Sequence, residues 1–219
     1  MRSYRELLSN DLAWPALEAA ARTSCRATIL PCDADAARAC LEKLQVTTRS
    51  TLGALAHETG GLFVDHGWLR LFGCGHERLR RALGTWNETL GVPTSDFLLV
   101  GDDVVGGAFA INGGALGAAV GNVFYFAPDR LAWQDMQVSH SAFVRWTFEG
   151  DVESFYESLR WRGWENEIEQ VGGDQALSVY PPPWTREGKD LSKVSRRAVP
   201  ASEVWSAQQE LARRVGLPR

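Results

Sequence analysis

A double glycine followed by two short apolar segments constrains the fold of this chain more than any other stretch. Residues 60–73 read GGLFVDHGWLRLFG, and we expect extended, apolar chain at 62–64 and at 68–72. Two glycines after a helix can supply a left-handed cap that residues with a Cβ resist. We expect His66-Gly67 to form a kink or bulge between the two apolar segments. A stretch this apolar has to lie inside a sheet, and its polar residues must find partners or face a groove.

Helical periodicity precedes this stretch and returns in the last third of the chain. Apolar spacing predicts helical chain over 4–22, with a second helical piece starting at Pro15. It predicts further helices over 33–44, 52–58, 76–90, from Ser139 or Ser141 to Gly150, 151–159, 164–171 and 200–215. Cys40 falls on the apolar side of its helix, so we interpret it as a core residue rather than a nucleophile. Arg78, Arg80 and Arg81 lie off the apolar side of the 76–90 helix, which predicts a solvated face. The charged, weakly patterned segment 185–197 predicts a mobile arm.

The middle third of the chain alternates apolar runs with glycine-rich turns. Strands are predicted at 27–30, 97–100, 108–111 and 122–126, with an edge-type strand at 131–138 and a closing strand at 176–180. The segment 101–107 and Asn112-Gly113-Gly114 are the turns between them, with Asp102 and Asp103 forming part of the first. Together with the helices, this predicts an α+β fold in which a largely antiparallel sheet is flanked by helices.

Composition excludes several classes of protein. The 219 residues suffice for one sizeable domain, and the formal charge of −4 argues against binding nucleic acid through the overall field. No apolar run is long enough to cross a membrane, and the N-terminus does not resemble a secretory signal. The four cysteines form no CxxC pair, so no zinc ribbon or thioredoxin motif is present. These observations predict a cytoplasmic protein with reduced thiols.

Several pieces of the sequence resemble a bacterial family, in the same order and with similar gaps. They are QVTTRS at 45–50, GGLFVDHGWLR at 60–70, Asp102-Asp103 with Gly106-Gly107, FYFAPD at 124–129, and Phe155-Tyr156 with LRW at 159–161 and Tyr180-Pro181. By these pieces the chain resembles domain-of-unknown-function family 2625 (DUF2625) over nearly its whole length. The family name implies no assigned activity.

A more diffuse pattern is similar to the SUKH superfamily. It comprises a helix, the double glycine, a meander carrying Asp102, an aromatic strand ending near Asp129, and Phe143 on a helix. The resemblance implies a SUKH-like α+β core, which we place at 46–182. An N-terminal helical lobe at 1–45 and an arm and helix at 183–219 are additions to that core, and we expect all three parts to form one domain. It also implies a binding role, which in that superfamily is often toxin neutralisation or the scaffolding of protein complexes.

The reactive side chains do not assemble an obvious catalytic site. Asp65 and His66 are adjacent on extended chain and should point to opposite faces, so neither easily serves the other. A small hydrolase that uses His66 with Asp65, Asp102 or Asp103 is the alternative function. His66, Cys74 and His76 lack the tight spacing of a zinc site, and the glycine-rich turns lack the order of a phosphate loop. We therefore predict no metal and no cofactor.

The sequence favours a binding or scaffold module over an enzyme. Its ligand would be another protein, held between the sheet edge and the loops at 65–70 and 102–112, with no part for nucleic acid or membrane. Acidic side chains there would favour a basic partner. The predicted binding residues are Asp65, His66, Trp68, Arg70, Asp102, Asp103 and Asn112.

Overall fold

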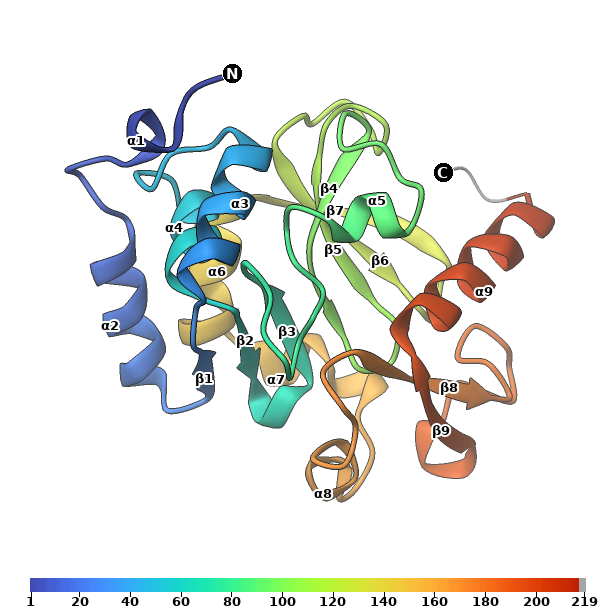
Figure 1. Ribbon diagram of the computed structural model, residues 1–219. Coiled ribbons are helices and arrows are strands. Elements are labelled where there is room, and N and C mark those ends of the chain that lie inside the picture. The colour runs from blue at the N-terminus through green and yellow to red at the C-terminus, as the bar shows by residue number, and fades with distance from the viewer. Residues whose placement is uncertain (217–219) are drawn as a thin grey trace.

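Seven strands form one antiparallel sheet in which the spatial order follows the order along the chain (Figure 1). The computed structural model describes residues 1–216. The strands are β1 (Ala27–Leu30), β2 (Gly61–Val64), β3 (Leu69–Phe72), β4 (Phe97–Asp103), β5 (Ala108–Asn112), β6 (Asn122–Ala127) and β7 (Ala132–Ser139). The predicted α+β fold with a largely antiparallel sheet is confirmed, and β7 is an edge strand as expected.

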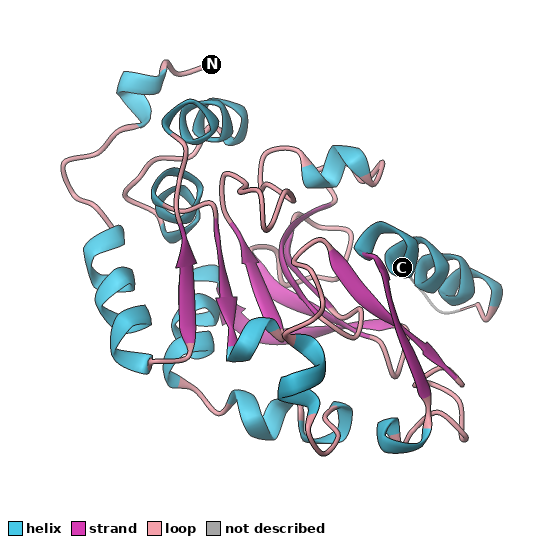
Figure 2. Cartoon of the chain, turned by 60° about the horizontal axis from the view of Figure 1, so that its bottom comes forward, coloured by secondary structure: helices cyan, strands magenta, loops and turns pink. Residues whose placement is uncertain are grey.

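Helices surround this sheet, and four of them begin at a residue whose side chain caps the helix (Figure 2). Asp33, Ser50, Ser139 and Asp151 each accept a hydrogen bond from the backbone N–H three residues later, as helix N-caps do. The helices are α1 (Tyr4–Leu7), α2 (Trp14–Ser24), α3 (Ala34–Leu44), α4 (Thr51–Glu58), α5 (Trp86–Thr89), α6 (His140–Glu149), α7 (Val152–Phe155), α8 (Trp164–Ile168) and α9 (Ala201–Arg214).

The glycine-rich stretch is a tight hairpin, not one extended segment with a kink. Asp65, His66 and Gly67 have consecutive positive φ angles of 49°, 59° and 92°, and they reverse the chain. β2 then pairs with β3, with Gly61 opposite Phe72 in the register. The predicted kink is therefore wrong, because the two apolar halves are matched in length and satisfy each other's backbone groups.

Two further elements differ from the prediction. The helix expected over 76–90 is reduced to α5, and the chain before it is irregular, with His76 and Leu79 exchanging backbone hydrogen bonds. The segment expected to be an arm contains a 3₁₀ turn at Leu191–Lys193 and the start of strand β9 (Ser195–Pro200). β9 pairs with β8 (Gln175–Tyr180) in a separate two-stranded sheet. The closing strand therefore does not join the main sheet.

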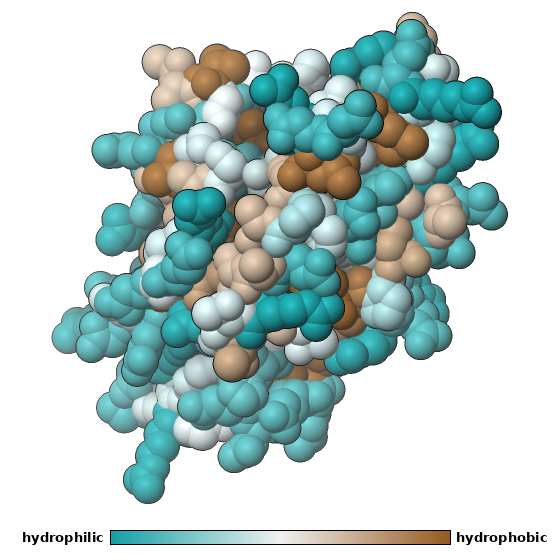
Figure 3. Space-filling view, turned by 90° about the vertical axis from the view of Figure 1, so that its left-hand side faces the viewer, coloured by the Kyte–Doolittle hydropathy of each residue, from teal (hydrophilic) through white to brown (hydrophobic). Residues whose placement is uncertain are grey.

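One continuous hydrophobic core includes buried side chains from Leu7 to Ala212. Cys40 is part of it and only 5% exposed, which confirms its interpretation as a core residue. On the face of the molecule shown in Figure 3, apolar residues stand in small groups among hydrophilic ones. No helix within residues 1–216 is long and apolar enough to cross a bilayer. The division of the chain at residues 45 and 182 stays a prediction.

His140, the first residue of α6, is a buried imidazole, and neither ring nitrogen has a hydrogen-bond partner among residues 1–216. Burial lowers its pKa to about 4, because the charged form would lose its hydration. Since the folded pKa lies below the unfolded one, this residue removes stability as the pH falls from about 6.5 towards 4. Asp103 has the opposite effect. Burial raises its pKa to about 6, so the folded state is protonated at a higher pH than the unfolded state and gains stability as the pH falls.

We expect His140→Leu to stabilise the protein more in acid than at neutral pH. The difference in free energy of unfolding between variant and wild type should grow by about 2 kcal/mol between pH 7.5 and pH 5. Urea denaturation at both pH values measures it, and taking the difference cancels the titration of Asp103. A difference that stays constant with pH would show that His140 is not buried in its neutral form.

Candidate functional site

The largest hollow near the predicted binding residues is an open groove of about 670 Å³. Four segments line it: Arg26 just before β1, the turn between β2 and β3, the chain from Asp151 to Trp161, and the start of α8. The groove therefore exists only because the hairpin turn is opposed by a segment almost a hundred residues later. We refer to it as the Asp65 groove.

An ion pair and stacked rings form the wall beneath the Asp65 groove. Arg160 Nη2 donates to Asp65 Oδ2 at 2.7 Å, and the Arg160 guanidinium lies 4.1 Å from the ring centroid of Trp164 and 5.0 Å from that of Trp68. Arg26 Nε lies 3.9 Å from the other oxygen of Asp65. Asp65 is thus neutralised by two arginines, and the aromatic rings hold one of them in place.

The rim of the Asp65 groove carries four further carboxylates, those of Asp151, Glu153, Glu157 and Glu165. Within residues 1–216, none of these four lies within 4.0 Å of a cationic side chain. Asp151 also caps α7 through Ser154 N. The groove is therefore acidic at its rim, with aromatic walls at Trp161 and Trp164.

His66 is on the groove but is not paired with the carboxylates that the hydrolase hypothesis requires. Its side chain is 53% exposed, and Nδ1 lies 3.4 Å from Glu169 Oε1. Asp65 instead accepts a hydrogen bond from Arg160. Asp102 accepts one from Arg70, and Asp103 accepts one from Tyr125. A general base needs an orienting group at hydrogen-bond distance, and none of the three predicted carboxylates supplies one here.

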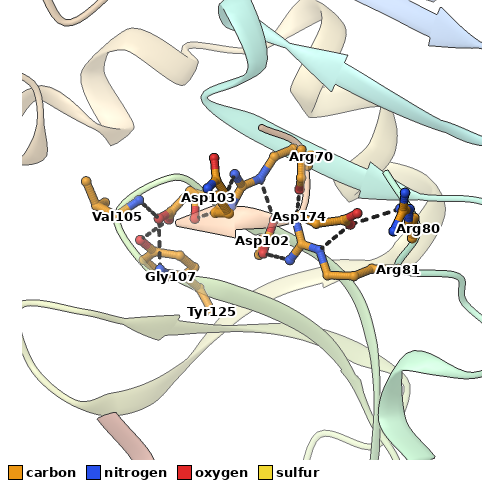
Figure 4. Close-up of polar contacts among 11 residues, drawn as sticks. Arg70, Arg80, Arg81, Asp102, Asp103, Val105, Gly107, Tyr125 and Asp174 are labelled. Atoms are coloured by element: carbon orange, nitrogen blue, oxygen red, sulfur yellow. Dashed lines mark hydrogen bonds and ion pairs between the residues drawn. The ribbon is translucent and has the colours of Figure 1, made fainter. Parts of the chain in front are cut away.

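Beside the groove, two buried arginines share one carboxylate (Figure 4). Arg70 Nε donates to Asp102 Oδ1 at 2.7 Å, and Arg81 contacts the same carboxylate through two nitrogens. Arg70 and Arg81 are only 1% and 4% exposed. They also donate to the backbone carbonyls of Asp103, Gln175 and Gly173. These contacts connect β3 and β4 to the chain around the start of β8, so the cluster has a structural role.

Asp103 is a second, separate centre of polar contacts. Its carboxylate accepts hydrogen bonds from Tyr125 Oη at 2.7 Å, Gly107 N at 2.8 Å and Val105 N at 3.0 Å. A Cβ at Gly107 would lie 2.0 Å from Asp103 Oδ2, so only glycine allows this approach. Because β4 continues to Asp103, the prediction that both aspartates belong to a turn is wrong. Asp103 instead fixes the turn that follows the strand.

A second concave site lies under α9, at the other end of the sheet. This cavity has a volume of about 320 Å³, and its walls include Phe97, Phe126, Trp133 and Trp205. Ser206, Gln209 and Arg213 are the polar residues that α9 contributes to it. Its size and aromatic lining are typical of small-molecule sites. None of the seven predicted binding residues lies on it.

Comparison with known proteins identifies the family. Residues 5–204 match the family described as "Protein of unknown function DUF2625". The chain belongs to this family. It is 36% identical over 213 residues to the uncharacterised protein YbfG of Escherichia coli (strain K12), which covers 96% of this chain and 97% of that protein. It is 37% identical over 165 residues to an uncharacterised protein of Haemophilus influenzae, covering 74% of this chain and 72% of the other. No solved structure matches the chain significantly.

In this DUF2625 protein the seven predicted binding residues fall into separate places. Asp65 and His66 lie on the groove, and Trp68 is fully buried beneath it. Arg70 and Asp102 meet in the buried cluster, whereas Asp103 has its own partners. Asn112 organises the loop after β5, accepting hydrogen bonds from Gly114 N and Leu116 N. Whether any of the seven binds a ligand stays a prediction.

Sequence reasoning about this DUF2625 protein missed Arg160 and misplaced Arg81. Arg81 is buried on Asp102 rather than solvated, because the helix that would have exposed it does not form. Arg160 gave no local signal except the aromatic residues beside it, since its partner Asp65 is 95 residues away. Among the described residues, no group of three or more His, Cys, Asp or Glu side chains is arranged to hold a metal.

Proposed function

We propose that this protein is a binding module that holds a basic segment of another protein in the Asp65 groove. One observation carries the proposal: four rim carboxylates, none of which has a cationic partner within residues 1–216, surround a hollow that Trp161 and Trp164 help to line. Lysine and arginine side chains are attracted both to carboxylates and to the faces of aromatic rings. Extended basic chain, with a side chain reaching into the hollow, fits this combination best.

The resemblance to the SUKH superfamily supports the same class of function. That superfamily scaffolds complexes or neutralises toxins, so immunity against a basic toxin domain is the specific form of the proposal that the resemblance implies. We place this role in the cytoplasm, where the four free cysteines would stay reduced.

The contacts of His66 do not favour the alternative of a small hydrolase. The imidazole is exposed and lies near Glu169, which is itself 61% exposed. Such a pair is open to solvent. Among the residues that line the groove, Ser154 is the one serine and there is no cysteine. The backbone N–H of Ser154 donates to Asp151, the N-cap of α7. A binding role needs only the charge and shape that the groove already has.

Neutralising three rim carboxylates should weaken the binding of a basic peptide about tenfold. The probe is fluorescein-labelled octalysine, and its Kd is measured by fluorescence anisotropy with the full chain. In Glu153→Gln/Glu157→Gln/Glu165→Gln, each lost exposed pair contributes about 0.5 kcal/mol, which together gives the tenfold change. Binding of wild type should also weaken as NaCl is raised from 50 to 300 mM.

A matched variant distinguishes binding at the Asp65 groove from attraction of the peptide to the overall negative charge of the protein. Glu77, Glu187 and Glu203 are exposed and lie outside the groove. Glu77→Gln/Glu187→Gln/Glu203→Gln changes the net charge by the same amount, and we expect less than a twofold change in Kd. Equal weakening by both triple variants, or no octalysine binding by wild type, would overturn the proposal.

A further inference from the structure

Two cysteines far apart in the sequence meet at one end of the sheet. Cys32 Sγ lies 3.1 Å from Cys74 Sγ, although 42 residues separate them. Leu30 and Phe72 are both register partners of Gly61, one on each side of β2. Cys32 lies two residues after Leu30, and Cys74 lies two residues after Phe72. The two thiols therefore face each other across the start of β2.

Gly60 makes this approach possible. It lies directly before β2, between the two cysteine-bearing segments, and donates its N–H to Leu30 O. A Cβ at this position would lie 2.5 Å from Pro31 O and 3.0 Å from Gly75 O, the carbonyls beside Cys32 and Cys74. Without a side chain in between, the two segments come close enough for their sulfur atoms to touch.

The surroundings of the two sulfur atoms differ. Cys32 is half-buried, whereas Cys74 is only 6% exposed. The sulfur atoms of Cys32 and Cys74 share a hydrogen bond in which either thiol can donate, and donation by Cys32 lowers the pKa of Cys74 and raises that of Cys32. The remaining cysteines have no such neighbour: Cys25 is exposed, and burial raises the pKa of Cys40 to about 12. The chain thus contains one pair suited to thiol chemistry and two internal controls.

We propose that Cys32 and Cys74 are a redox modification site, where hydrogen peroxide converts the two thiols to a disulfide. The Cys74 thiolate attacks one peroxide oxygen, the O–O bond breaks, and hydroxide leaves and takes up the proton as water. The resulting sulfenic acid is attacked at sulfur by Cys32, so the S–S bond forms, the S–O bond breaks and a second water leaves. Two thiols are oxidised and one peroxide is reduced. A dithiol such as dithiothreitol reverses the step by exchange.

The disulfide would link β1 to β3 across the strand between them. Closing the loop between Cys32 and Cys74 restricts the unfolded chain, so the oxidised protein should be the more stable form. We expect the thermal midpoint to rise by about 5–10 °C on oxidation and to return on reduction.

Peptide mapping of the full chain tests the proposal, because trypsin places each cysteine on its own peptide. Cys32 lies on 27–38, Cys74 on 71–78, Cys25 on 23–26 and Cys40 on 39–43. After one equivalent of hydrogen peroxide, we expect a mass loss of about 2 Da and a linked 27–38/71–78 peptide that dithiothreitol separates. In Cys25→Ser/Cys40→Ser the same linked peptide and the same rise in thermal midpoint should form.

Single variants complete the test. Cys32→Ser and Cys74→Ser should give no linked peptide and no rise in thermal midpoint with peroxide, while their reduced forms melt cooperatively. In excess hydrogen peroxide, Cys32→Ser should instead carry Cys74 through the sulfenic acid to the sulfinic acid, with one peroxide reduced to water at each step, because no resolving thiol is present. Wild-type protein in which Cys32 and Cys74 stay thiols, become sulfinic acids or link to Cys25 or Cys40 would overturn the proposal.

Discussion

Asp102→Ala is expected to lower the free energy of unfolding by about 3–5 kcal/mol, a large fraction of the total stability of a typical protein. The substitution leaves Arg70 and Arg81 buried without the carboxylate that both contact. An uncompensated buried charge is far more costly than a lost surface pair. Guanidinium denaturation followed by tryptophan fluorescence measures the loss.

Two comparisons make this prediction specific. Asp174 is 37% exposed and lies 3.6 Å from Arg81 Nε, so Asp174→Ala should cost less than about 1 kcal/mol. In a double-mutant cycle, Arg81→Leu should cost less in the Asp102→Ala protein than in wild type, because the cation has already lost its partner. Equal costs for the two aspartates, or additive costs in the cycle, would contradict a shared buried carboxylate.

Trp68→Ala should cost a comparable amount, about 3–5 kcal/mol. The side chain is fully buried, and its ring meets those of Tyr156, Trp161 and Trp164 at centroid distances of 5.1–5.8 Å. Removing it leaves a cavity beneath the Asp65 groove and takes away one of the rings on which Arg160 rests. Octalysine binding should weaken together with stability, and both are measured on the same preparation.

Trp68→Phe is the matched control for this substitution. The indole Nε1 has no hydrogen-bond partner, so phenylalanine loses volume but no hydrogen bond. We expect less than half the cost of the alanine variant and an unchanged Kd for octalysine. A phenylalanine variant as unstable as the alanine variant would show that shape, not the presence of an aromatic ring, decides the packing there.

The features that sequence reasoning predicted correctly depend on neighbours within a few residues. Asp33 and Ser139 cap helices because the amides they accept from lie three residues ahead, and that spacing is visible in the sequence. Continuous apolar runs between glycine-rich turns likewise placed the strands of the meander, because a strand covered on both faces of the sheet is apolar at successive positions. The antiparallel sheet followed from the short turns between those strands.

What could not be predicted depends on residues distant in sequence. Arg81 was expected to be solvated because nothing near it shows the carboxylate of Asp102, 21 residues later. Arg160 and Asp65 are 95 residues apart in the sequence, so no local sequence pattern indicates the groove that their contact forms. The strand β9 is charged and half-exposed, and only its pairing with β8 makes it a strand. In each case a tertiary partner outweighs the local preference.

The sequential strand order has a consequence for synthesis on the ribosome. Each strand of the main sheet emerges next to a partner that is already available, so the sheet can grow one strand at a time. The carbonyls of Gly173 and Gln175 that complete the shell of Arg81 and Arg70 emerge much later. We therefore expect both guanidinium groups to remain hydrated on the nascent chain until the last quarter has been translated.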